Sequence, residues 1–185
     1  MKRRILLPAA VVLALCPFGL VHAGLNAYML ATGEQQGQIK GGVTQAGKVD
    51  QMQVVQSSHE IVSPRDAASG LPTGKRQHKP FTITKPVDKA TPLLLKALVT
   101  NETLTQVVIN YWRPTQGGAE QLAFSVTLTG AKIVNHTIRQ LPTYEAANAS
   151  VPELEEIQFV YDKITWTWTN PNLTATDSWT IDRVQ

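Results

Sequence analysis

Three histidines outside the N-terminal segment, His59, His78 and His136, are the residues that could first suggest metal or acid–base chemistry. Imidazole is a common metal ligand and the usual general base of enzymes. Each of the three lies alone in or beside a predicted strand, without a second histidine or a carboxylate at metal-ligand spacing. We therefore interpret them as surface or structurally satisfied histidines. The sequence predicts no metal site and no cofactor.

Two further patterns resemble catalytic sites. Ser58 precedes His59, but adjacent residues of a strand point to opposite faces, so this pair cannot easily share a proton. Glu153, Glu155 and Glu156 form an acidic group at the start of a strand, where a pair of carboxylates could act as acid and base. We interpret this group as a solvated strand end. The sequence predicts no catalytic residue, and we expect a protein that is not an enzyme.

The four tryptophans could form a stacking platform for sugars, as in a carbohydrate-binding module. Trp166 and Trp168 share one face of a strand. Large aromatic side chains are more often buried in a core or a subunit interface, so we favour that role. The set comprises Trp112, Trp166, Trp168 and Trp179.

The N-terminus has the pattern of a secretory signal peptide. Lys2, Arg3 and Arg4 precede the 17 uncharged residues 5–21, and Val21-His22-Ala23 places small residues where a signal peptidase cleaves. A bilayer-spanning helix needs about 20 apolar residues, so we do not expect stable membrane insertion. We predict residues 1–23 as a signal peptide and 24–185 as one domain, secreted or periplasmic. Alternatively, translation starts at position 20 or 21, and the protein is cytoplasmic until it is ejected.

Charge and cysteine content exclude several classes of protein. The chain has 17 Lys and Arg against 14 Asp and Glu, and loss of residues 1–23 removes three positive charges, which leaves 14 against 14. Nothing then indicates a nucleic-acid partner, which would require a basic patch. The single cysteine, Cys16, lies in the signal segment, so disulfides and thiolate chemistry are not expected in residues 24–185.

The remaining pattern predicts many strands and one helix. Phe81 and Ile83 lie in a strand, Asp88 stands where a helix N-cap is expected, and Pro92 falls in the first helical turn. Apolar residues from 153 to 169 change phase near Asp162, which indicates a bulge or a strand covered on both faces. The fold class is mainly β, a compact antiparallel β-barrel or sandwich with one α-helix packed at its side. We predict strands at 25–31, 51–62, 77–85, 103–112, 120–128, 132–141, 153–169 and 177–184, a helix at 89–100, and loops at 63–74 and 142–152.

Two motifs in this order resemble one bacterial family. HKPFTITKPVDKATPLLLKAL, residues 78–98, joins a strand to a proline-started helix, and YDKITW, residues 161–166, is an aromatic-Lys-Ile-aromatic strand. Both are similar to the Hcp proteins, which form the inner tube of the type VI secretion system. The resemblance covers essentially all of residues 24–185, although Hcp proteins usually start at the first strand without a signal.

The resemblance implies a structural subunit that forms homohexameric rings. These rings would stack into a tube that carries effector proteins, with a sheath outside and a spike at the tip. The family makes ring-to-ring contacts through the loop that corresponds to residues 63–79, so the resemblance implies stacking contacts at Arg65, Asp66, Lys75 and Arg76. Two alternatives remain open: an exported binding module of the same fold, with a sugar or a protein as its ligand, and an exported effector.

Overall fold

The computed structural model describes residues 25–178. The predicted signal segment, Trp179 and the end of the predicted closing strand lie outside this range. Among the described residues, no helix is long and apolar enough to cross a membrane. The structure confirms a mainly β fold with one α-helix, α1 (Thr91–Val99), and a short 3-10 turn, η1 (Ala146–Asn148). The strands are β1 (Ala27–Gly33), β2 (Gly37–Ile39), β3 (Met52–Val54), β4 (Gln56–Ser58), β5 (Ile61–Val62), β6 (Gln77–His78), β7 (Phe81–Pro86), β8 (Leu104–Pro114), β9 (Glu120–Arg139), β10 (Leu154–Val160), β11 (Lys163–Trp168) and β12 (Leu173–Ser178).

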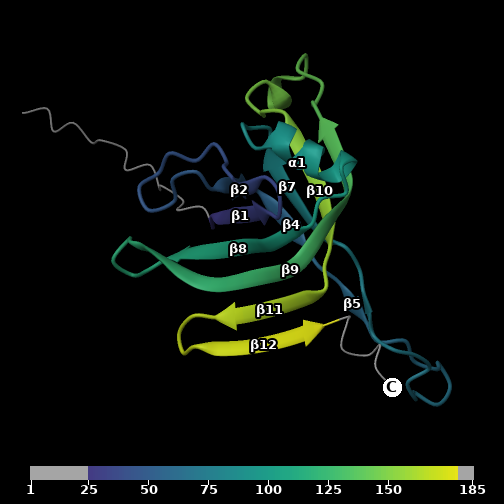
Figure 1. Ribbon diagram of the computed structural model, residues 1–185. Helices are drawn as coiled ribbons and strands as arrows, with labels where there is room; N and C mark the ends of the chain where they lie inside the picture. The colour runs from purple at the N-terminus through teal and green to yellow at the C-terminus, as the bar shows by residue number, and fades with distance from the viewer. Residues whose placement is uncertain (1–24, 179–185) are drawn as a thin grey trace, which may run out of the picture.

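The 20-residue strand β9 connects two antiparallel sheets (Figure 1). Its first half pairs with β8 on one side and β11 on the other, whereas its second half pairs with β10. Gly130 stands between the two halves with φ of 62°, and an added Cβ would collide with the Asp162 carboxylate. A glycine is therefore needed where β9 passes from one sheet into the other.

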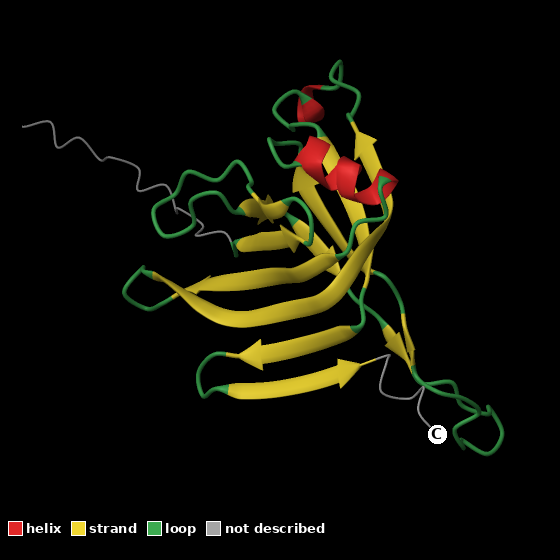
Figure 2. Ribbon diagram, viewed as in Figure 1, coloured by secondary structure: helices red, strands yellow, loops and turns green. Residues whose placement is uncertain are grey.

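The two sheets also meet along residues 52–58. β3 pairs with β1 in the first sheet, and β4 pairs with β7 in the second. The chain changes sheets at Val55, so this segment joins the two sheets, and no continuous ladder of the described strands closes them into a barrel. β11 and β12 extend beyond this unit as a two-stranded flange (Figure 2). Most of β12 is exposed.

Alternating apolar residues build the core between the sheets. Ile109 of β8, Leu128 of β9 and Ile157 of β10 are fully buried. The helix α1 covers the second half of β9, and its buried side chains include Leu94 and Ala97. Every second residue of the strands and every third residue of the helix thus pack into one core.

Several predicted strands are divided or joined in the structure. The predicted strand 51–62 is split into β3, β4 and β5, because its residues change partners twice. The predicted strands 120–128 and 132–141 form the single strand β9, since Gly130 allows the ladder to continue. The predicted strand 153–169 is two strands, because the chain leaves one sheet at Tyr161-Asp162 and enters the other. This transition explains the change of phase there.

The closing strand begins earlier than predicted. β12 starts at Leu173, directly after the turn at residues 170–172, and pairs with β11 in register from Leu173↔Trp168 to Ser178↔Lys163. The predicted start at Asp177 was therefore wrong, because the turn already returns the chain beside β11.

Of the tryptophans, Trp166 packs against the core, in line with the favoured role. Trp168 is 37% exposed at the end of the flange, with the Arg113 guanidinium 5.1 Å from its ring centroid. Trp112 and Tyr28 hold the buried ammonium of Lys48, whose Nζ lies 4.4 Å and 4.7 Å from their ring centroids. This cation–π contact fastens the loop of residues 40–51 to the first sheet.

Candidate functional site

The segment between β5 and β6 projects from the body of the molecule, as predicted for residues 63–74 (Figure 1). Asp66 organises it: its Oδ1 accepts hydrogen bonds from the backbone N–H of Ser69 at 2.7 Å and of Ala68 at 3.2 Å. The Ser69 hydroxyl and backbone bonds lower the pKa of the Asp66 carboxyl. Arg65 donates to the Gly70 carbonyl at 3.1 Å. The projecting loop, defined here as residues 63–76, is therefore shaped by its own polar groups.

The four candidate stacking residues fall into two groups. Arg65 and Asp66 lie in the outer part of the projecting loop, where both are exposed. Lys75 and Arg76 lie at its base, and Arg76 forms a two-pronged ion pair with Asp177 of β12. Arg76 is thus a structural anchor as well as a surface charge. The role of all four residues in stacking stays a prediction.

A polar cluster anchors the base of the projecting loop. The Tyr161 hydroxyl contacts His59 Nε2 at 2.6 Å and His78 Nδ1 at 2.9 Å, and His78 Nε2 lies 2.8 Å from Asp177 Oδ2. Hydrogen bonds from Arg76, and then from His78, lower the pKa of Asp177 despite partial burial. Burial, and then the charge of Asp177, raises the pKa of Tyr161.

The structure brings together two histidines that were predicted to lie alone. The ring centroids of His59 and His78 are 6.1 Å apart, because the segment after β4 and the end of β6 converge on Tyr161. Both histidines are structurally satisfied, as expected. Among residues 25–178, no group of three or more His, Cys, Asp or Glu side chains is placed to hold a metal ion.

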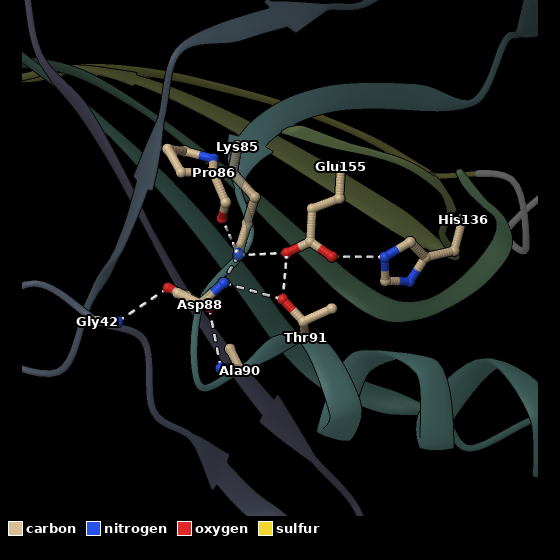
Figure 3. A network of polar contacts seen from close by, with 8 residues as sticks. All are labelled: Gly42, Lys85, Pro86, Asp88, Ala90, Thr91, His136 and Glu155. Carbon is tan, nitrogen blue, oxygen red and sulfur yellow. Dashed lines mark hydrogen bonds and ion pairs between the residues drawn. The ribbon is translucent and has the colours of Figure 1, made fainter. Parts of the chain in front are cut away.

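A second polar network lies inside the molecule, beside the start of the helix (Figure 3). Lys85 of β7 forms an ion pair with Glu155 of β10, and both side chains are fully buried. Glu155 Oε2 also lies 2.6 Å from His136 Nε2, and Glu155 Oε1 accepts the Thr91 hydroxyl at 2.8 Å. Burial by itself would raise the pKa of Glu155, but the bonds from His136 and Lys85 outweigh it and lower this pKa.

The interpretation of Glu155 as part of a solvated strand end was therefore wrong. Its carboxylate faces inward, in phase with Ile157 and Phe159, and three polar partners from β7, β9 and α1 surround it. All its partners are protein groups within the fold. This arrangement joins the helix to both neighbouring strands and supports a structural role.

Asp88 contributes to the helix start in a different way than predicted. The helix begins at Thr91, and Ala90 is its N-cap. Asp88 lies two residues earlier, where its Oδ1 accepts the Ala90 N–H at 2.9 Å and the Lys85 ammonium at 2.8 Å. Its Oδ2 accepts the Gly42 N–H at 2.8 Å. Asp88 thus links the helix start to the buried network and to the loop of residues 40–51 (Figure 3).

Comparisons with known proteins agree with this architecture. Residues 28–168 match the family described as "Type VI secretion system effector, Hcp". The "Major exported protein" of Pseudomonas aeruginosa is 40% identical over 162 residues, which cover 83% of this chain and 94% of that protein.

Solved structures show the same fold. A crystal structure of an Hcp protein superposes with a TM-score of 0.80 at 29% identity, over 84% of this chain and 98% of the other. The secreted protein Hcp3 from Pseudomonas aeruginosa has a TM-score of 0.70 and 33% identity, over 84% and 99% of the two chains.

Proposed function

The chain belongs to the Hcp family of the type VI secretion system, and we propose that it forms the hexameric rings of the inner tube. Family membership provides the main support. In this proposal the rings stack into a hollow tube that carries effectors, inside a sheath and behind a spike. The function is structural, and no chemical step is assigned to the chain.

The flange β11–β12 is the structural observation that carries ring formation. β12 has β11 as its neighbour within the described residues, and most of its side chains are exposed. Leu173, at the start of β12, is 63% exposed. An exposed strand edge with apolar side chains is prone to pair with another chain, and a head-to-tail contact closes into a ring. A second copy of this chain is therefore the expected partner of the flange.

A substitution at Leu173 tests this role. We expect Leu173→Lys to reduce the ring to smaller species, because it places a charge in a subunit contact, while the melting temperature of the monomer stays near that of the wild type. Val99→Lys is the matched control, since Val99 is 78% exposed at the end of α1, away from the flange. Light scattering after gel filtration distinguishes the two. Rings that survive Leu173→Lys would contradict the flange as an interface.

Export is the second part of the proposal. A basic segment, the uncharged residues 5–21 and a small-residue site at 21–23 support cleavage after Ala23. A relative of this chain is named for its export. Intact-mass measurement on protein from the native host is expected to show a chain that starts at Gly24. A chain that starts with methionine at position 20 or 21 would contradict the signal peptide and leave loading from the cytoplasm as the route.

A further inference from the structure

One tyrosine hydroxyl holds both ends of the projecting loop. His59 lies just before β5 and His78 ends β6, so these two residues flank the loop in sequence. Both imidazoles contact Tyr161 Oη, at 2.6 Å and 2.9 Å, and Tyr161 lies in the link between β10 and β11. The backbone bond from Lys79 N–H to the Glu60 carbonyl, at 3.0 Å, closes the base. Tyr161 therefore fixes the loop to the body of the molecule.

The hydrogen bonds run in one direction when both histidines are neutral. His59 Nε2–H donates to Tyr161 Oη, the Tyr161 O–H donates to His78 Nδ1, and His78 Nε2–H donates to Asp177 Oδ2. Asp177 is held in place by Arg76. Each link then has one proton and one acceptor, which fixes the tautomer of each imidazole.

This series of hydrogen bonds can accept one extra proton but not two. If His78 is charged, its Nδ1–H points at Tyr161 Oη, and the tyrosine proton must turn toward a neutral His59. If both imidazoles are charged, two N–H groups point at the Tyr161 oxygen, and the tyrosine proton has no acceptor on either imidazole. Two positive rings would also repel each other across 6.1 Å. Double protonation must therefore break at least one contact with Tyr161.

The surroundings also oppose a second charge. His59 packs against Phe81, with ring centroids 5.2 Å apart, and burial, followed by the charge of His78, lowers the pKa of His59. The side chain of His78 is 4% exposed. A cavity of about 340 Å³ adjoins His78 and Tyr161, and its charged side chains are those of Lys79, Lys132 and Asp162. Among residues 25–178, Arg76 and Asp177 also face the cluster.

We propose that the chain His59–Tyr161–His78–Asp177 is a proton-sensitive latch, which holds the projecting loop near neutral pH and releases it in mildly acidic solution. This inference rests on the proposed function, because it concerns control of the loop assigned to ring stacking. The direction of the pH dependence follows from the pKa of His59. An unfolded or released His59 binds a proton below pH 6.5, its ordinary pKa, whereas the pKa of His59 in the latched form is lower. The latch is therefore stable above pH 6.5 and weakens as the pH falls.

Hydrogen exchange of residues 60–79 in the full chain measures the latch directly. At low micromolar concentration, we expect the exchange rate, corrected for intrinsic chemistry, to rise about tenfold between pH 7.5 and 5.5, the effect of one proton over one pKa unit. Tyr161→Phe is expected to exchange fast at both pH values. Tyr111→Phe is the matched control, because it also loses a half-buried hydroxyl, here bonded to Ser57 at 2.7 Å, without touching the latch.

A second variant keeps the hydrogen bond to Tyr161 but removes the group that binds a proton. The amide of His59→Gln can donate to Tyr161 without binding a proton, so its loop is expected to stay protected at pH 5.5. The latch is wrong if wild-type exchange does not change with pH, or if Tyr161→Phe matches the wild type. Light scattering of stacked rings at both pH values tests the other premise. If exchange changes with pH but stacking does not, the latch holds and the role of the loop in stacking is contradicted.

Discussion

Lys85 and Glu155 form an ion pair in which neither side chain has any exposed surface. Removing two charges from water costs free energy, and their attraction compensates only if the remaining polar atoms are also bonded. Here Asp88, Thr91 and His136 provide those bonds. The pair therefore holds β7, β10 and the start of α1 in one fixed arrangement.

Breaking this pair should be costly. We expect Glu155→Gln to lower the free energy of unfolding by about 3–5 kcal/mol, because it leaves the Lys85 charge buried without its main partner. Urea unfolding at fixed protein concentration measures the change. Glu156→Gln is the control, since the neighbouring Glu156 is partly exposed and bonds weakly to Gln158 at 3.4 Å. Equal stability of the two variants would show that the pair does not organise the fold.

Acid should act through the same carboxylate. Because the pKa of Glu155 is lower in the folded state than its ordinary value of 4.5, the unfolded chain binds more protons in acid. The contribution of Glu155 is then complete above about pH 4.5 and is lost as the pH falls through its folded pKa. Urea midpoints measured from pH 7 to pH 3 should fall less steeply for Glu155→Gln than for the wild type. A parallel decline in both proteins would contradict this assignment.

The helix provides a test of the core. Leu94 has no exposed surface, so Leu94→Ala should cost about 2–5 kcal/mol through lost burial and an unfilled cavity. The adjacent Leu93 is 36% exposed, and Leu93→Ala should change stability much less. Thermal and urea unfolding of the two variants provide the comparison. If Leu93→Ala were the more damaging, the helix would pack through a different face.

Much of the buried network could be predicted from strand periodicity. Lys85 is in phase with Phe81 and Ile83, and Glu155 is in phase with Ile157 and Phe159, so alternation placed both charges on buried faces. The apolar residues of both strands were predicted from this alternation, whereas the two charges in the same phase were not predicted to be buried. A charged residue in phase with the buried residues of its strand indicates that a partner of opposite charge lies inside the fold, as Glu155 does for Lys85.

The latch could not be predicted in the same way. His59, His78, Tyr161 and Asp177 come from four segments, and local patterns do not specify which distant strands become neighbours. The order of the elements and the presence of one helix after Pro86 were predictable, because turns, prolines and alternation are local. The length of β9 was not, since Gly130 looked like a turn but serves as the point where the strand changes sheets.

Charge reversal on the projecting loop should separate folding from stacking. We expect the double variant Arg65→Glu and Lys75→Glu to keep its melting temperature and its ring, while the rings stack less, because the change alters an exposed contact surface. Negative-stain electron microscopy and light scattering measure stacking. Arg139→Glu, at the exposed end of β9, is the matched control. Equal stacking in both variants would exclude these two charges from the contact.

The mass of the assembly in solution tests the central claim most directly. Light scattering coupled to gel filtration of the chain from Gly24 to Gln185 is expected to give about six subunits, because the exposed flange requires a second copy and a head-to-tail contact closes into a ring. A clean monomer at tens of micromolar would contradict the ring and favour an exported binding module of the same fold.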